Sequence, residues 1–181
     1  ADAFNRIGDC LFHNRQFAQA EEQYSKAAQI LPSAGDYALY QKGFVMGLQK
    51  DYQGKISMMD RLISEYPSSS YVDDALFEKG RSYVLLDNNT AAARSFEQLI
   101  KQYPESALSR KAGIQLGLIY FNGIGVGKDI QRGISLITQS ANRGFARAQN
   151  YLGVLYYEGN GVEQNDLEAF QWYGKAAVQH F

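Results

Sequence analysis

The sequence is poor in the residues that build covalent cross-links and metal sites. It has one cysteine and two histidines among 181 residues. A single cysteine cannot form an internal disulfide, so the fold depends on packing alone. His13 and His180 stand at opposite ends of the chain, which leaves no material for a histidine-based metal site. We therefore expect neither a metal nor a cofactor.

The sequence also lacks an excess of charge of one sign and any long apolar run. Eighteen basic side chains stand against nineteen acidic ones, without a basic block, so nucleic acid is excluded as an expected partner. No apolar stretch has the length that crosses a bilayer, and no stretch has the pattern of a signal peptide. We expect a soluble chain without membrane insertion.

Glycine and alanine, by contrast, recur at a regular interval. The repeated glycines are Gly8, Gly43, Gly80, Gly117 and Gly153, at spacings of 35, 37, 37 and 36 residues. The alanines five positions before them are Ala3, Ala38, Ala75, Ala112 and Ala148. A period in this range is typical of a solenoid of stacked supersecondary units.

Each block has the apolar spacing of two helices with a polar break between them. In the first block the two runs are Ala3, Phe4, Ile7, Leu11 and then Phe17, Ala20, Tyr24, Ala27, Ala28. Glycine inside a helix costs about 1 kcal/mol relative to alanine. We expect the repeated glycine to offset this cost by letting the two helix backbones approach closely, opposite small residues such as Ala20 and Ala92.

Prolines mark the block ends in the first part of the chain. Pro32, Pro67 and Pro104 should stop the second helix of each block, because proline lacks the amide hydrogen and disfavours helical geometry before it. Short polar residues should cap the helices that follow. These candidate caps are Asp36, Ser70 and Ser106.

These positions resemble the tetratricopeptide repeat. The first block matches its signature at Phe4, Ile7, Gly8, Leu11, Ala20, Tyr24, Ala27 and Pro32, and the third block at Gly80, Tyr83, Ala92, Phe96 and Pro104. The second block departs from the pattern because Lys42 and Lys55 replace apolar or small residues, and Lys79 repeats the first departure. The resemblance implies three such repeats over residues 1–105, of the type found in bacterial envelope proteins.

After Tyr120 the blocks resemble the Sel-like repeat, which has a longer loop between its helices. The match runs through Ala148, Leu152, Gly153, Tyr156, Gly159, Gly161, Val162, Ala169, Trp172, Lys175 and Ala176, with a looser copy from Ala112 to Gly144. The resemblance implies two such repeats over residues 106–181, continuous with the first part. The expected fold is all-α, a right-handed α-α superhelix of five helix-turn-helix repeats.

Two features of the chain suggest chemistry but have simpler interpretations. Cys10 and His13 lie three apart on one predicted helix, yet Cys10 shares a repeat column with Val45 and Leu155, which predicts a buried apolar side chain. The glycines from Gly123 to Gly127 suggest a phosphate loop, but residues 122 and 129 break the Walker pattern. Their copy at Gly159 and Gly161 indicates a repeat turn. We expect no catalytic residue and no enzyme.

The resemblance implies a protein-interaction scaffold whose first helices line a concave groove that binds a peptide or partner protein. The residues expected to face that partner are Asn5, Asp9, Phe12, Tyr37, Tyr40, Phe44, Phe77, Arg81, Ile114, Phe121, Asn150 and Tyr157. Tetratricopeptide repeats that capture an acidic carboxyl terminus cluster lysine and asparagine there, and these positions lack that clamp. An apolar or aromatic-bearing ligand fits better, unless the aromatic residues simply pack between neighbouring first helices.

Three alternatives remain open at this stage. The chain is either a natural mixed array or an engineered hybrid or excised fragment without a physiological ligand, since it begins without methionine and ends at Phe181 without a polar covering helix. An enzyme using Cys10 and His13 is the second. Self-association through Trp172, Val178 and Phe181 of the last block is the third. The resemblance alone suggests the bacterial periplasm or cell envelope.

Overall fold

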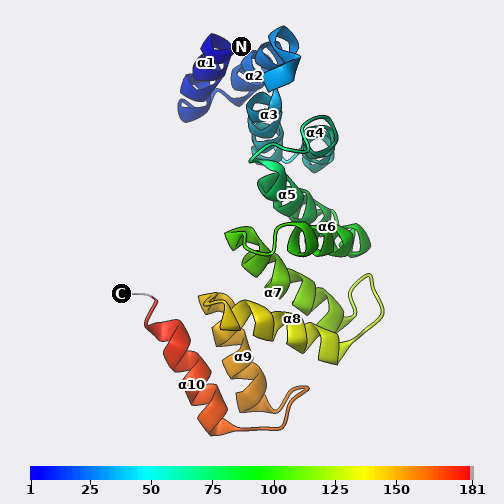
Figure 1. Cartoon of the computed structure of the whole chain (residues 1–181), viewed down its shortest axis with the longest axis vertical. Helices are drawn as coiled ribbons and strands as arrows, with labels where there is room; N and C mark the ends of the chain where they lie inside the picture. Colours follow the sequence, from blue (N-terminus) through cyan, green and yellow to red (C-terminus); the bar gives the residue numbers. More distant parts are fainter. Residues whose placement is uncertain (180–181) are drawn as a thin grey trace. The chain divides into compact units, whose positions relative to one another are not determined.

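The computed structural model describes residues 1–179, and this part of the chain is helical without a strand (Figure 1). Its α-helices are α1 (Asp2–His13), α2 (Phe17–Ile30), α3 (Asp36–Leu48), α4 (Tyr52–Glu65), α5 (Val72–Leu85), α6 (Asn89–Gln102), α7 (Ala107–Asn122), α8 (Ile130–Asn142), α9 (Ala146–Glu158) and α10 (Asp166–Ala177). A 3-10 turn, η1 (Pro32–Ala34), separates α2 from α3. None of the helices over residues 1–179 is both long enough and apolar enough to cross a membrane. The all-α architecture expected from the repeat period is confirmed.

The helices form two compact units, residues 1–88 and the residues from Asn89 onward. In the first unit each helix from α1 to α5 packs against the next along the chain. The same succession runs from α6 to α10 in the second unit. The boundary falls between α5 and α6, inside the third block. The division at residue 105 into two repeat types that continue as one array stays a prediction.

The helix ends follow the sequence signals at most positions. The helices α2, α4 and α6 each end two residues before a proline, at Pro32, Pro67 and Pro104. Ser106 caps α7, because its side chain accepts a hydrogen bond from the amide of Leu108. Asp36 has a different partner, since its carboxylate accepts a hydrogen bond from the Ser69 hydroxyl at 2.6 Å.

The repeated glycine does bring the paired helices close, but the neighbour is a large side chain. A Cβ on Gly8 would lie 2.6 Å from a Tyr24 ring carbon, and one on Gly153 would lie 2.8 Å from Tyr173. The expected pairing with small residues is therefore wrong at these positions. The glycine leaves room for a bulky residue of the second helix that closes the hairpin.

The long loops of the later blocks are braced against the preceding helix pair. Gly125 has a φ of +71°, and its carbonyl accepts a hydrogen bond from the Thr90 hydroxyl. Gly161 has a φ of +78° and lies against the side chains of Ile130 and Ile134. Only glycine adopts this backbone easily. Both loops are repeat turns that pack against neighbouring helices of the chain. This agrees with the interpretation of the glycine cluster as a repeat turn and not a phosphate loop.

Candidate binding groove

A row of aromatic rings connects the first helices of the first unit. Phe12 on α1 lies 6.0 Å from Phe44 on α3, measured between ring centroids, and Phe44 stacks on Tyr40 at 6.4 Å. Tyr40 stacks on Tyr71, the residue before α5, at 5.3 Å, and Tyr71 lies 5.9 Å from Tyr37. These five residues, the aromatic row, join α1, α3 and the residue that precedes α5 through ring contacts.

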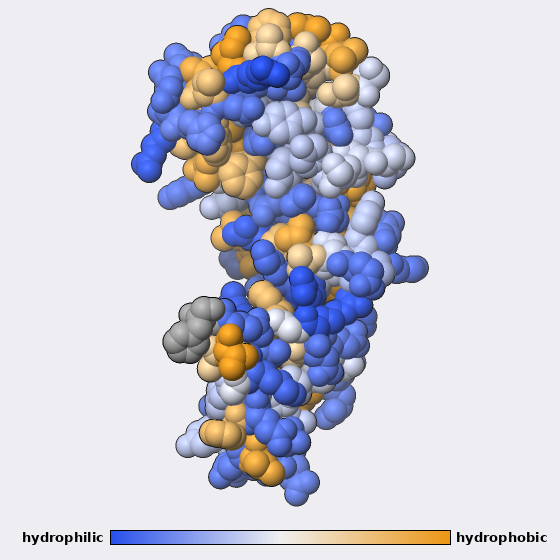
Figure 2. Space-filling view, turned by 60° about the vertical axis from the view of Figure 1, so that its left-hand side comes forward, coloured by the Kyte–Doolittle hydropathy of each residue, from blue (hydrophilic) through white to orange (hydrophobic). Residues whose placement is uncertain are grey.

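Helical spacing explains why the central rings share one face. Tyr37, Tyr40 and Phe44 are three and four residues apart, so they lie along one side of α3. Each of the five rings is half-buried. They therefore pack between neighbouring first helices and still offer surface, which combines the two possibilities that the sequence left open. In the upper part of Figure 2, where the first unit lies, apolar surface is visible between hydrophilic side chains.

Asp9 fixes one end of this row. Its Oδ1 atom accepts hydrogen bonds from the hydroxyls of Tyr24 on α2 and Tyr37 on α3, each at 2.7 Å. Burial raises the pKa of both tyrosines, and the hydrogen bond to Asp9 raises it further. The Asp9 carboxylate thus ties three helices together. It was expected to meet a ligand, but its oxygen already serves a structural purpose.

A hollow of about 260 Å³ opens beside the aromatic row. It is lined by Phe44, Gly47, Leu48, Tyr52, Lys55, Glu78, Arg81, Ser82 and Leu85. Inside it the Lys55 ammonium donates to one oxygen of the Glu78 carboxylate, and Arg81 donates to the other at 3.0 Å. The Lys55 and Glu78 side chains are 10% and 11% exposed. We call this site the Lys55 hollow.

The hollow results from an exchange of sizes between two repeat columns. Position 47 is glycine, where the other blocks carry Phe12, Val84, Phe121 and Tyr157. Position 55 is lysine, where they carry Ala20, Ala92, Gly133 and Ala169. A Cβ on Gly47 would lie 2.7 Å from Cδ of Lys55. The missing side chain on α3 is what lets the lysine of α4 reach the surface formed by the first helices.

Other residues expected in the groove lie elsewhere. Ile114 is 1% exposed and Phe121 is 6% exposed, both in the core of the second unit, so the expectation that they face a ligand is wrong. The reason is that α8 and α9 cover this side of α7 with Ile137 and other apolar residues. Phe77 is also buried, which leaves Arg81 as the exposed predicted residue of α5.

The remaining predicted residues show mixed exposure. Asn5 on α1 is half-buried, and its Oδ1 atom is buried without a hydrogen-bond partner. Asn150 and Tyr157 lie exposed on α9 of the second unit. Trp172 was expected to be uncovered in the last block, but it is 8% exposed and packs in the core beneath Lys175. Val178 is exposed, whereas Phe181 and His180 lie outside the described residues.

The structure also tests the expectations for Cys10 and His13, the two residues of α1 that suggested catalysis. Cys10 is exposed, which contradicts the burial expected from its repeat column. Val45 and Leu155 are buried in that column, whereas α1 packs against α2 with the Cys10 side chain left in contact with solvent. His13 is exposed as well, and residues 1–179 hold no group of three side chains suited to a metal ion.

Sequence reasoning missed several residues of the site, among them Glu78 and Tyr71. Glu78 carried no repeat signal, and Tyr71 stands outside the regular helix positions. Lys55 was noticed as a departure from the pattern but was not placed in the groove. A comparison of the repeat column of Lys55 with that of Gly47 reveals from the sequence that the two positions exchange a large and a small residue.

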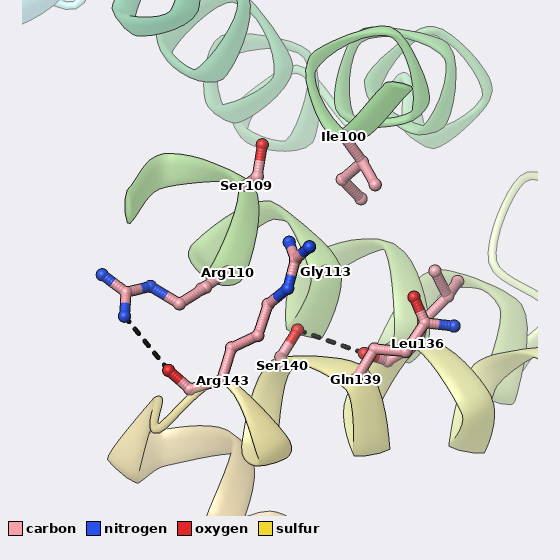
Figure 3. Close-up of a pocket in the computed structure, with 8 residues that line it drawn as sticks. All are labelled: Ile100, Ser109, Arg110, Gly113, Leu136, Gln139, Ser140 and Arg143. Atoms are coloured by element: carbon pink, nitrogen blue, oxygen red, sulfur yellow. Dashed lines mark hydrogen bonds between the residues drawn. The ribbon is translucent and has the colours of Figure 1, made fainter. Parts of the chain in front are cut away.

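The second unit has hollows of a different kind. The one in Figure 3 has a volume of about 10 Å³, so it has room for a single water at most. Ser140 of α8 and Arg143, the residue after α8, extend toward α7 there, and Arg110 donates to the Arg143 carbonyl at 3.1 Å. A roomier hollow of about 530 Å³ lies between α9 and α10, beside Arg147 and Tyr173. It lacks the charged cluster of the Lys55 hollow.

Comparison with known proteins identifies both repeat types. The tetratricopeptide repeat model matches residues 37–69 and 74–106. The Sel1 repeat model matches residues 112–145 and 146–179. Repeats of these kinds build protein-interaction scaffolds, and the helix pairs described above follow the matched segments.

The similar proteins match this chain at low sequence identity. The chain is 26% identical over 159 residues to the chitin synthase regulator SKT5 of Saccharomyces cerevisiae, covering 83% of this chain and 22% of that protein's length. The crystal structure of MamA is 22% identical, with a TM-score of 0.72 over 96% of this chain and 94% of the other. A Sel1 repeat protein from Oxalobacter formigenes is 24% identical, with a TM-score of 0.71 over 98% and 72% of the two chains. The chain is therefore an all-α solenoid protein that carries tetratricopeptide repeats followed by Sel1 repeats.

Proposed function

We propose that the chain is a non-catalytic scaffold that binds a peptide segment of a partner protein along the aromatic row and the Lys55 hollow. The observation that carries this proposal is their continuity. Phe44 belongs to both the row and the lining of the hollow, so a ligand that lies over α3 contacts both. Half-exposed aromatic rings next to an open hollow are the usual anchors of a protein interface.

The rigidity of the row supports a binding role. The Tyr37 hydroxyl is held in place because it donates a hydrogen bond to the Asp9 carboxylate. Tyr71 stacks on Tyr40 with an angle of 20° between the ring planes. Side chains that are already ordered lose little conformational entropy when a ligand binds. An apolar or aromatic peptide side chain is the complement that these rings favour.

A peptide selection tests the proposal. Displayed random peptides are selected on the whole chain, and each recovered peptide is measured against Tyr40→Ala, Tyr40→Phe and Tyr157→Ala. We expect apolar or aromatic peptides whose affinity falls about tenfold with Tyr40→Ala, because a buried aromatic contact is lost. Tyr40→Phe and Tyr157→Ala should bind as the parent does. Peptides that tolerate Tyr40→Ala in a folded variant contradict this binding surface.

The cellular location of this scaffold is a prediction as well. Only the resemblance to repeat proteins of the bacterial envelope suggests the periplasm. Fractionation of cells that make the whole protein measures it directly, and recovery with cytoplasmic markers contradicts it.

A further inference from the structure

We propose that the Lys55 hollow recognises a carboxylate of the bound peptide, carried next to an aliphatic side chain. This inference rests on the proposed peptide-binding role and names the chemical group that the hollow takes. Its starting point is the paired exchange at positions 47 and 55. Glycine on α3 and lysine on α4 bring an ammonium group to a surface that, apart from Tyr52 of α4, is otherwise lined by residues of α3 and α5.

The lining of the Lys55 hollow carries one more positive than negative side chain. The charged residues that line it are the cations Lys55 and Arg81 and the carboxylate of Glu78, which pairs with both. The Glu78 carboxylate donates nothing and already accepts from both partners. A ligand carboxylate would balance the two cations with two anions, and the low exposure of Lys55 strengthens that attraction.

The ammonium of Lys55 has donor capacity left for such a ligand. It carries three N–H donors. One of them meets Glu78, and the Phe44 ring lies 5.5 Å from the nitrogen. Arg81 stands at the opening with 55% of its side chain exposed, so its guanidinium is accessible from solvent. A carboxylate in the hollow can accept from both cations, and charge-assisted hydrogen bonds of this kind are strong.

The rim of the hollow is apolar. Leu48 ends α3 and Leu85 ends α5, and these side chains are 48% and 56% exposed. Phe44 adds an aromatic wall. A ligand group that is only charged would leave this surface in water, whereas an aliphatic neighbour of the carboxylate would cover it. The ligand chemistry is therefore a carboxylate with an adjacent aliphatic side chain.

Another lysine of the first unit shows what a purely structural ion pair looks like. Lys79 on α5 pairs with Asp60 on α4, and neither residue lines the Lys55 hollow. That pair joins two neighbouring helices as the Lys55 pair does. It is the matched control for the loss of a lysine charge.

The test uses three short probes on the whole isotope-labelled chain. Acetyl-leucyl-leucine carries a terminal carboxylate, and its amide carries none. Acetyl-leucyl-aspartyl-leucine amide carries an internal carboxylate. Nuclear magnetic resonance follows the backbone amides of Gly47 and Ser82, both of which line the hollow. The two acidic probes distinguish a chain terminus from an acidic side chain as the source of the carboxylate.

We expect at least one acidic probe to shift the Gly47 amide, with an affinity about fivefold or more above that of the neutral amide. Arg81→Gln, at an exposed position, and Lys55→Met should remove this preference, while Lys79→Met should keep it. Equal binding of acidic and neutral probes overturns the inference, as does a preference that survives Arg81→Gln. Absence of any shift with all three probes also overturns it.

The outcome is separable from that of the proposed function. Selected peptides that depend on Tyr40 but tolerate replacement of every carboxylate by amide leave the binding role intact and refute the carboxylate site. Selected peptides that bind without Tyr40 refute the binding surface itself, whatever the short probes show.

Discussion

The Lys55 side chain on α4 fills the space that a side chain on Gly47 of α3 would need, with its Cδ atom 2.7 Å from the position of a Cβ there. Other blocks place a large residue on the first helix and a small one on the second, as Phe12 and Ala20 do. The exchange moves the larger side chain of the pair from the first helix to the second. It also places an ammonium group in the Lys55 hollow.

The exchange predicts strong coupling between the two positions. Gly47→Val should destabilise the first unit by about 1–3 kcal/mol because it overpacks Lys55. Lys55→Ala should destabilise it as well, since Glu78 loses a partner in a buried setting. The double variant restores the pattern of Val84 and Ala92 and should lose less than the sum of the two. Urea unfolding of all four proteins measures this cycle, and additive losses would refute the coupling.

Asp9 should contribute more to stability than its place on a first helix suggests. Asp9→Ala leaves the hydroxyls of the buried Tyr24 and the half-buried Tyr37 without their acceptor, which should cost about 1–3 kcal/mol of unfolding free energy. Asp2→Ala on the same helix is the control. Asp2 pairs with Arg6 at an exposed position, so its loss should cost about 1 kcal/mol or less. Similar losses for the two variants would contradict the structural role of Asp9.

The buried tyrosines predict a loss of stability in alkali. The pKa values of Tyr24 and Tyr37 are raised above that of an unfolded tyrosine, which is about 10. The folded state therefore binds these protons more tightly, so their contribution is complete below pH 10 and is lost as the pH rises beyond it. Urea unfolding over a pH series should show stability falling above about pH 10.

A variant assigns that alkaline loss to the first unit. Tyr37→Phe removes one of the protons concerned and should make the fall with pH shallower. An equally steep fall in the Tyr37→Phe protein would show that this tyrosine does not contribute.

The glycines of the first long loop should differ sharply in their tolerance of a side chain. Gly125→Ala imposes a positive φ on alanine and places a Cβ 2.9 Å from that of Asn89, so a loss of about 1–2 kcal/mol is expected. Gly127→Ala adds a methyl group with no atom within 4 Å and should be neutral. Thermal unfolding of the two variants compares them. Equal tolerance would mean that the loop does not pack as described.

Repetition made much of the architecture predictable. The spacing of Gly8 and its equivalents indicated paired helices because each copy must solve the same packing problem. Proline positions located helix ends, since Pro32 and its equivalents cannot continue a helix. The family matches and the observed helices agree with these inferences.

The site was less predictable because it depends on departures from the repeat. The other residues in the repeat column of Cys10 predict an apolar, buried side chain, but Cys10 is exposed. Burial depends on what packs against α1 and not on the residue type alone. Ile114 shares a column with Tyr40, yet the packing of α8 and α9 places it in the core. The two bonds to Asp9 require hydroxyls from different helices to meet at one oxygen, which spacing alone does not reveal.

The affinity of a selected peptide for the Tyr40→Ala and Tyr40→Phe proteins, measured by calorimetry beside a urea unfolding curve for each, tests the central claim most directly. The account predicts that a folded Tyr40→Ala protein binds about tenfold more weakly than the parent, while Tyr40→Phe binds equally well. Unchanged affinity of the folded Tyr40→Ala protein would contradict it.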